Sequence, residues 1–351
     1  MTAEPTEVTR YGATRADVER LLDGEPRYRV DQVWDALWTQ RRALSDTTNV
    51  PRALRAGLER ALPLALEERI RQDSADGLTT KWLWVARGAQ IETVLMRSAK
   101  RATVCVSSQA GCAMACTFCA TGQAGFERHL DAGEIVEQVM RAQHASPQRV
   151  SNVVFMGMGE PLANLDEVWQ AVVRLHDEAS LSARHITIST VGIVPGMRRL
   201  TELPLPVTLA VSLHAPDDEL RNELVPVNRR YPVVEVVDAA RAYADRKGRR
   251  VTFEYAMIDH VNDDLDRADR LAALLARFPG GAHVNLIPLN PTAGYAGRVP
   301  QHRRIDVFAR RLRANGVNAT VRRNRGVDID AACGQLRARR PVAPEPATMD
   351  S

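Results

Sequence analysis

The feature that most constrains the fold is a strand-then-helix unit that repeats along the chain from about residue 101 onward. Six segments have the apolar, β-branched composition of buried strands, and amphipathic helical patterns separate them. This alternation favours a parallel sheet, because two parallel strands must be joined by a crossover, which is usually a helix. We therefore predict an α/β protein whose sheet curls into a partial (β/α)6 barrel over residues 101–325. The expected strands are RATVCVS, VSNVVFMG, HITISTV, VTLAVSLH, VTFEYAMI and AHVNLIPL.

Two smaller regions precede the barrel. Residues 14–66 contain three short segments with helical spacing of apolar residues, which predicts a small helical accessory domain. Trp34 and Trp38 fall on that spacing and are expected in its core. Residues 67–100 change to the alternating period of strands around the turn signal Asp76-Gly77, which predicts a β-hairpin linker.

The two ends of the chain have compositions that favour disorder. Residues 1–13 are polar and lack an apolar period, and residues 341–351 are rich in Pro and Ala. The start also lacks the basic and then apolar form of a secretory signal, and no stretch approaches the ~18 apolar residues of a membrane span. We expect a cytoplasmic protein that does not contact membranes and is a monomer.

Charge gives a weak indication of an anionic partner. The 351 residues carry a net charge of +4, and all but three of the 47 basic residues are arginine. Arginine is suited to bidentate contacts with phosphate, although such a bias can also come from genome composition.

The stretch that carries chemistry is CVSSQAGCAMACTFCATG, which holds four of the 5 cysteines. Cys112, Cys116 and Cys119 follow the spacing C-x3-C-x2-C, and thiolates spaced in this way can bind one soft metal centre from a short loop. A structural zinc ion needs a fourth ligand, which Cys105 could supply. A cubane 4Fe–4S cluster takes one thiolate per iron, so three cysteines would leave one iron open. The residues alone leave both centres possible.

The C-x3-C-x2-C spacing resembles the signature of the radical S-adenosylmethionine (SAM) superfamily. The longer run SSQAGCAMACTFCATG resembles one branch of it, the RlmN/Cfr methyltransferases, which methylate rRNA adenine. The resemblance covers the chain from about residue 14 to 340. It implies a 4Fe–4S cluster on Cys112, Cys116 and Cys119, SAM bound to the open iron, and an external electron donor. It also implies RNA contact by the accessory domain, where YRVDQVWDALW is similar to the YRxxQ segment of the family.

Polar or glycine-rich residues follow the predicted strands. The carboxyl ends of parallel strands meet at one edge, which is where ligands bind in such folds. In GMGEP the glycines let backbone approach a ligand closely, and Glu160 offers acceptor oxygens. Pro161 favours the RlmN side of the family, because the antibiotic-resistance relative resembles GMGEA there. The resemblance implies SAM contacts from Gly159, Glu160, Ser189, Ser212, Leu213, His214 and Asn290.

The fifth cysteine, Cys333, lies in TVRRNRGVDIDAACGQLR, close to Arg322, Arg323 and Arg325. Positive charge favours the thiolate, which is the nucleophilic form of cysteine. On residue type alone, a lone cysteine is more often a small buried apolar side chain. The resemblance implies that residues 326–340 form the C-terminal catalytic segment and that Cys333 carries the transferred methyl group. It further implies that Cys105 is the resolving thiol, which forms a disulfide with Cys333.

Glu92 shares one face of a predicted strand with Val94 and Met96. A carboxylate buried among apolar side chains has its proton affinity raised, which suits a general base, whereas an edge-strand glutamate would face water. The resemblance implies that Glu92 is the proton acceptor of the reaction.

The function implied by the resemblance is methylation of adenine C2 in 23S rRNA at the peptidyl-transferase centre, and in tRNA at the adenine 3′ of the anticodon. Three alternatives stay open. The same chemistry could act at adenine C8, as in Cfr. The second alternative is a radical SAM enzyme of another kind, such as a glycyl-radical activase, although that function does not require Cys105 and Cys333. A non-catalytic RNA-binding module with structural zinc on Cys105, Cys112, Cys116 and Cys119 is the third.

Overall fold

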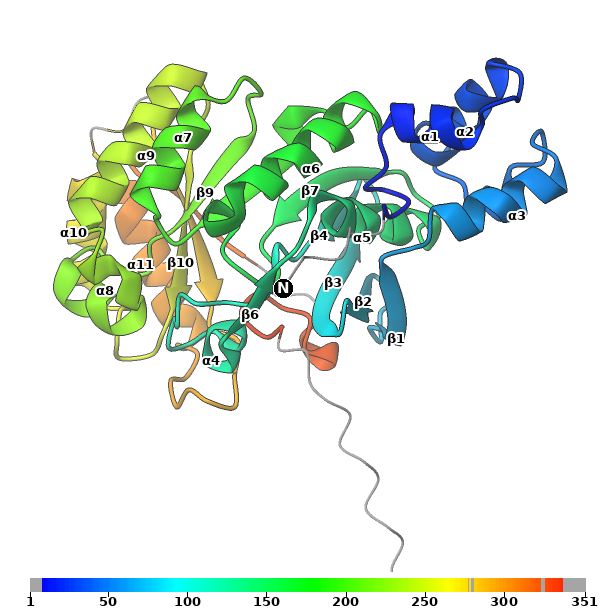
Figure 1. Ribbon diagram of the computed structural model, residues 1–351. Coiled ribbons are helices and arrows are strands. Elements are labelled where there is room, and N and C mark those ends of the chain that lie inside the picture. Colours follow the sequence, from blue (N-terminus) through cyan, green and yellow to red (C-terminus); the bar gives the residue numbers. More distant parts are fainter. Residues whose placement is uncertain (1–7, 277, 279–280, 323–325, 337–351) are drawn as a thin grey trace, which may run out of the picture.

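The computed structural model describes residues 8–276, 278, 281–322 and 326–336 (Figure 1). One ten-stranded sheet runs through the molecule in the order β1-β2-β3-β4-β7-β8-β9-β10-β11-β12. From β4 to β12 each strand is parallel to its neighbour, which confirms the predicted α/β class and partial barrel. The parallel strands are β4 (Ala102–Cys105), β7 (Val150–Phe155), β8 (Ile186–Thr190), β9 (Thr208–Ser212), β10 (Thr252–Met257), β11 (His283–Pro288) and β12 (Asn318–Val321).

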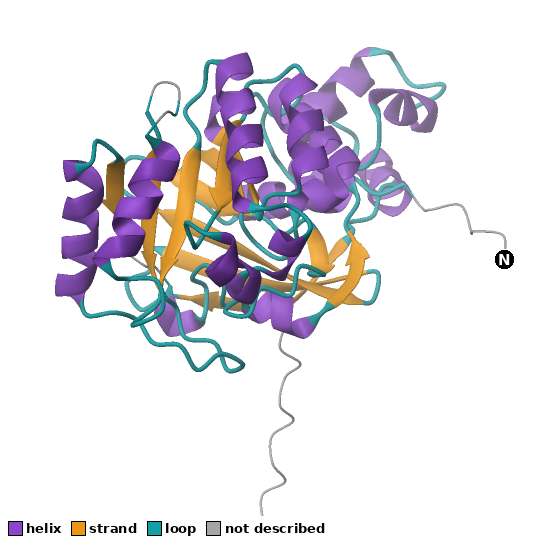
Figure 2. Ribbon diagram, turned by 90° about the vertical axis from the view of Figure 1, so that its left-hand side faces the viewer, coloured by secondary structure: helices purple, strands orange, loops and turns teal. Residues whose placement is uncertain are grey.

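All six predicted strands are present, and β12 is a seventh that the sequence analysis missed. It has four residues, which is too short for an alternating pattern to stand out. Helices cover the outer face of the parallel strands (Figure 2). They are α5 (Ala132–His144), α6 (Leu165–Asp177), α7 (Val194–Glu202), α9 (Val233–Lys247), α10 (Leu265–Leu275) and α11 (His302–Ala314). Two further helices lie at the strand ends: α4 (Ala120–Ala124) directly follows the segment that carries Cys112, Cys116 and Cys119, and α8 (Asp218–Leu224) packs against that segment.

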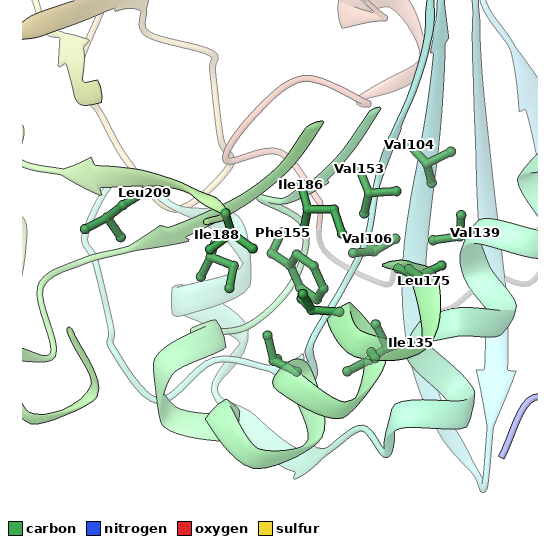
Figure 3. Packing of buried hydrophobic residues seen from close by; sticks show 14 of the residues in the cluster. Val104, Val106, Ile135, Val139, Val153, Phe155, Leu175, Ile186, Ile188 and Leu209 are labelled. Carbon is green, nitrogen blue, oxygen red and sulfur yellow. The ribbon is translucent and has the colours of Figure 1, made fainter. Parts of the chain in front are cut away.

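The hydrophobic core lies between the outer face of the sheet and these helices. Successive side chains of a strand point to opposite faces, so alternate residues of each parallel strand face the helices. Figure 3 shows Val104, Val153 and Ile186 from three neighbouring strands in one cluster with side chains of α5 and α6. The helical partners in this cluster include Ile135, Val139 and Leu175.

The intervening residues of the same strands face the inside of the barrel, and many of them are polar. A mixed inner face of this kind leaves room for cavities instead of a close-packed centre. The inward-facing polar residues include Thr103, Asn152, Thr187, Thr252, Glu254 and Asn285.

The predicted linker is an antiparallel extension of the barrel sheet. It consists of β1 (Leu66–Asp73), β2 (Thr79–Ala86) and β3 (Ala89–Arg97), and β3 pairs with β4 so that Val94 lies opposite Cys105. The pairing places the strand that carries Glu92 directly beside the strand that ends at Cys105.

The N-terminal region has the three expected helices, α1 (Arg15–Leu21), α2 (Tyr28–Trp38) and α3 (Arg52–Ala61). The side chain of Thr14 caps α1 in a reciprocal capping box with Asp17, which satisfies backbone N–H groups at the helix start. Trp38 is 1% exposed, as expected of a core residue.

Two expectations concern the chain ends. Residues 8–13 are not disordered, because Tyr11 is buried and its ring packs edge-on against Trp38 at 5.8 Å between centroids. Arg174 also donates to the carbonyls of Tyr11, Gly12 and Ala13, so contacts with distant parts of the chain order this mostly polar segment. Residues 1–7 and the predicted disordered tail 341–351 lie outside the described residues. No helix in the described part of the chain is long and apolar enough to cross a membrane.

Candidate active site

The cysteine loop is held at its base by a two-stranded pair, β5 (Gln109–Gly111) and β6 (Phe126–His129). The N–H of Cys112 donates to the Gly125 carbonyl at 2.7 Å, directly below the loop. Gly111 has φ +72°, and a Cβ at this position would lie 2.0 Å from the Gly125 oxygen. Only glycine can therefore occupy this position, and the loop leaves the sheet in a defined direction.

The three loop cysteines line one cavity with the carboxyl ends of the parallel strands. We call it the strand-end cavity. Of the seven residues predicted to contact SAM, six line it together with Cys112, Cys116 and Cys119. They are Gly159, Glu160, Ser189, Ser212, His214 and Asn290.

Leu213 is the exception, and the geometry does not support a SAM contact by its side chain. That side chain is fully buried in the hydrophobic core. Its backbone N–H donates to the Glu254 carbonyl, and its own carbonyl accepts from Arg221. Leu213 directly follows β9, and its side chain lies in the core while those of its neighbours Ser212 and His214 line the cavity.

The donor set suits an iron–sulfur cluster. Three soft thiols face one cavity, and burial raises the pKa of Cys112 to about 12, so binding of a cation or cluster would have to displace its proton. Among the described residues, no three His, Cys, Asp or Glu side chains are arranged so that they could hold a single metal ion. A cubane presents a separate iron to each thiolate, so its ligands need not converge on one point.

Glu160 connects two strand ends through its carboxylate. The N–H groups of Leu162 and Val191 donate to Oε1 and Oε2 at 3.0 and 2.8 Å, and the Glu160 N–H donates to Gln109 Oε1 at 2.8 Å. Burial raises the pKa of this carboxyl to about 7, against the lowering effect of these donors. The preceding Gly159 has φ +99°, and a Cβ there would meet the Gln109 side chain at 2.6 Å.

His214 connects the end of β9 to the cysteine loop. The N–H of Ala256 donates to Nδ1 at 3.0 Å, so the neutral ring carries its proton on Nε2. Burial, with a smaller effect of Arg221, lowers the pKa of His214 to about 3, which keeps the ring neutral at physiological pH. The ring of Phe118, from the cysteine loop, packs edge-on against it at 4.8 Å.

Arg221 lies fully buried behind the strand-end cavity. Its guanidinium donates to the carbonyls of Val191, Ser212 and Leu213, and to Asn228 Oδ1 at 2.6 Å. These carbonyls belong to the ends of β8 and β9, so a single cation holds two adjacent walls of the cavity together. Burial lowers the pKa of Arg221 to about 10, which leaves it charged at neutral pH.

Replacement of Arg221 by Met is expected to lower the free energy of unfolding by about 3 kcal/mol or more, because four buried acceptors lose their donor at once. Anaerobic urea unfolding of wild type and variant measures this difference. Arg221→Lys is the matched control: it keeps the charge but lacks the planar fork, so it should lie between the two. A Met variant as stable as wild type would show that these bonds contribute nothing net.

The segment that carries Cys333 is bound to both the cysteine loop and β11. Asn290 Nδ2 donates to the Cys333 carbonyl at 2.9 Å, and the N–H of Ala120 donates to the Gly334 carbonyl at 2.8 Å. Thr121 Oγ1 donates to the Leu336 carbonyl at 2.6 Å. These contacts place Cys333 in the lining of the strand-end cavity. It is far from the loop cysteines in the sequence, but it lines the same cavity as they do.

Cys105, the last residue of β4, lies in a second cavity inside the barrel, and Cys333 lines this inner cavity as well. The two thiols are close enough for electrostatic coupling: burial, followed by Cys333, raises the pKa of Cys105 to about 12. Arg322 lines the same cavity, and the neighbouring Cys333 raises the pKa of its guanidinium. All five cysteines are free thiols in the structure. Because Cys105 lies in the inner cavity, it is not grouped with the other three as a tetrahedral zinc site requires.

Glu92 is buried at 5% exposure, so the interpretation of a glutamate facing water is wrong. Its Oε1 lies 3.4 Å from Lys81 Nζ, which also donates to the Asp330 carbonyl at 3.4 Å. Glu92 is thus connected to the Cys333 segment through one lysine, although it lines neither cavity in this conformation.

The sequence analysis did not identify two residues of the site, Arg221 and Lys81. Arg221 sits in the SLHAPDDELR run and resembles any other helical arginine. Lys81 had a usable signal, because it is one of only three lysines and lies on the strand opposite Glu92.

A partial parallel barrel with three loop thiols at its strand ends defines the class of radical SAM enzymes. Agreeing with this, the family model "Radical SAM superfamily" matches residues 106–272. A crystal structure of a radical SAM methyltransferase from Sphaerobacter thermophilus matches with a TM-score of 0.89 and 47% identity, covering 95% of this chain and 100% of that one.

Sequence relatives narrow the class further. The probable dual-specificity RNA methyltransferase RlmN of Parafrankia sp. (strain EAN1pec) is 53% identical over 341 residues, which cover 91% of this chain and 88% of the relative. The protein with the same description from Corynebacterium efficiens is 51% identical over 333 residues, covering 92% and 90%. The chain therefore belongs to the RlmN family of radical SAM RNA methyltransferases. The cofactors of this family are a 4Fe–4S cluster and SAM, as the sequence analysis predicted.

Proposed function

We propose that this protein methylates C2 of an adenine in 23S rRNA at the peptidyl-transferase centre, and C2 of the adenine 3′ of the anticodon in tRNA. One observation carries the proposal: Cys333 lines both the cavity that contains the loop cysteines and the cavity that contains Cys105. A thiol in that position can receive a group on one side and be released on the other. The relatives described as dual-specificity RNA methyltransferases support two RNA substrates.

The loop thiols of Cys112, Cys116 and Cys119 would hold the cluster, and the residues around Glu160 and His214 would hold SAM. When bound, the cluster and SAM supply one-electron chemistry that amino-acid side chains cannot provide, with electrons from an external donor. The carboxylate of Glu160 suits a cationic amino group or ribose hydroxyls. His214, neutral with its proton on Nε2, offers a donor whose state does not change between pH 5 and 9.

Cys333 would carry the methyl group, because adenine C2 is not nucleophilic and cannot take a methyl cation directly. Its sulfur would take the methyl group from SAM by displacement, with S-adenosylhomocysteine as the leaving group, and Arg322 lines the same cavity as this sulfur. After the radical step, the carbon on the Cys333 sulfur is bonded to C2 of the adenine. The sulfur of Cys105 would then attack the sulfur of Cys333. The S–C bond breaks with its electron pair passing to the carbon, which takes up a proton to become the methyl group on C2, and the two cysteines are left as a disulfide.

Glu92 would accept the proton that leaves C2. Its burial next to Lys81 keeps water away, and the Lys81 contact with the Asp330 carbonyl connects it to the segment that carries Cys333. Because Glu92 lines neither cavity, this role needs the segment to shift when RNA binds. Such shifts are common on formation of a Michaelis complex.

The accessory domain offers a surface for RNA. Tyr28 at the start of α2 is 53% exposed, and the guanidinium of Arg29 lies 5.0 Å from the centre of its ring. An exposed aromatic ring beside an arginine suits an unstacked base and its phosphate.

Two measurements test the proposed function. Anaerobically purified protein should be brown with about four iron per chain, whereas colourless protein with zinc would favour a structural zinc module. Mass spectrometry of rRNA and tRNA from a deletion strain should show loss of 2-methyladenine in both, restored by the gene. Methyl at C8 would instead indicate Cfr-like specificity, and loss in rRNA alone would remove the tRNA part of the proposal.

A further inference from the structure

The inner cavity occupies the half of the barrel opposite the strand-end cavity. Its volume is about 540 Å³, within the range of small-molecule sites. Where the strand-end cavity is lined by the carboxyl ends of the parallel strands, the inner one is lined by residues from their amino-terminal halves. These include Thr103, Asn152, Thr187, Thr208, Thr252 and His283.

Four residues line both cavities and so lie at the boundary between them: Met156, Glu254, Arg322 and Cys333. The inner cavity is therefore lined by both thiols of the proposed reaction, Cys105 and Cys333. Cys105, at 7% exposure, lines the inner cavity and is not among the residues that line the strand-end cavity. A small molecule that reacts with the sulfur of Cys105 would therefore reach it through the inner cavity, from the amino-terminal side of the barrel.

The lining of the inner cavity favours an anion. Arg101 and Arg250 are exposed residues at the starts of β4 and β10, and Arg322 lies at the inner end, against one carboxyl from Glu254. That carboxyl accepts from Asn285 Nδ2 at 2.9 Å, and burial raises its pKa. Burial and Arg250 lower the pKa of His283, so it adds no positive charge at neutral pH. Cations at both ends of a cavity raise the local concentration of small anions.

We propose that the inner cavity binds a small anionic thiol, which reduces the disulfide between Cys105 and Cys333 from the amino-terminal side of the barrel. The inference rests on the proposed function, since that function leaves this disulfide after each methyl transfer. It assigns the reductant a route separate from the strand-end cavity, where SAM and RNA bind.

The chemistry balances with two thiols per disulfide. The thiolate of the first attacks the sulfur of Cys105, the S–S bond breaks, and Cys333 leaves as a thiolate beside Arg322. The second attacks the sulfur of the first, giving the small-molecule disulfide and the Cys105 thiolate, which takes up a proton. Attack at Cys105 is favoured because Cys105 lines the inner cavity, and because burial raises the pKa of Cys105 to about 12, which makes it a poor leaving group.

The test uses the oxidised full-length protein, with the disulfide verified by peptide mass spectrometry. Its reduction rate is measured with mercaptoethanesulfonate (anionic), 2-mercaptoethanol (neutral) and cysteamine (cationic), each divided by the rate with a small disulfide under the same conditions. We expect the anionic thiol to be favoured over the cationic one by about 10-fold at low salt, and less at high salt. Equal normalised rates would overturn the proposal.

A pair of charge variants locates the effect. Arg101→Glu with Arg250→Glu should abolish or reverse the preference, whereas Arg229→Glu with Arg310→Glu, an equal charge change at residues that do not line the cavity, should leave it intact. Equal effects of the two pairs would mean that net charge alone is responsible, which contradicts a site in the cavity.

Further measurements distinguish failure of the cavity proposal from failure of the proposed function. A Cys333→Ala variant leaves Cys105 as a free thiol, and its labelling by anionic and cationic methanethiosulfonate reagents measures the charge preference without any disulfide. No preference at Cys105 overturns the cavity proposal alone. Absence of the disulfide after turnover contradicts the proposed chemistry and, with it, the need for this reductant.

Discussion

A Cys105→Ala variant is expected to accumulate with RNA covalently attached to Cys333. The reaction proceeds on Cys333 up to the S–C2 adduct, but the sulfur that should attack Cys333 is missing. Cys105 is the thiol that shares the inner cavity with Cys333, so within the described residues no other cysteine lines that cavity to replace it. Purification from methylating cells, followed by nuclease digestion and mass spectrometry of the Cys333 peptide, measures the adduct.

The variant should fold, because alanine keeps most of the apolar contacts that Cys105 makes with Val94 and Leu336. The control is the double variant Cys105→Ala with Cys333→Ala, which should be purified free of RNA. Recovery of the single variant without bound nucleic acid, from cells whose wild-type enzyme is active, would exclude Cys105 as the resolving thiol.

A Cys333→Ala variant is expected to retain cluster and SAM binding while RNA methylation falls below detection. Asn290 donates a hydrogen bond to the backbone carbonyl of Cys333, which alanine keeps, so the segment should stay in place. The variant lacks the sulfur that carries the methyl group. Iron content, SAM affinity and incorporation of label from methyl-labelled SAM into RNA separate these properties.

Cys333→Ser is the closer control for shape, since it replaces sulfur with a poorer nucleophile of similar size. It should also be inactive, because a serine hydroxyl is a much weaker nucleophile than a cysteine thiol. Methyl transfer by either variant would remove Cys333 from the mechanism, whereas loss of iron would point to a structural role next to the cysteine loop.

The two cavities give the reaction a spatial order. Under the proposed function, group transfer to Cys333 would take place on the side of the loop cysteines, and release would involve Cys105, which lines the inner cavity and not the strand-end cavity. Without that separation Cys105 would itself be open to methylation. The high pKa of Cys105, caused mainly by burial, protects it further until Cys333 presents a sulfur to attack.

Much of the fold followed from local pattern. The six strand-and-helix units, the capping boxes at Thr14 and Asp131 and the cysteine spacing are set by neighbours within a few residues, so one sequence is enough to predict them. The short strand β12 and the buried Tyr11 were missed for the complementary reason. Each is defined by contacts with distant parts of the chain, and its own neighbours give no periodic signal.

The sequence by itself determined the class of fold and the family, and it predicted which residues carry the chemistry. Tertiary structure alone decided how those residues are grouped: Cys333 between two cavities, Cys105 in the inner one, Glu92 beside Lys81, Arg221 across two strand ends, and Leu213 in the core. The physical reason is that residue type records what a side chain can do, whereas its partners depend on strand order and on which face of the sheet it occupies.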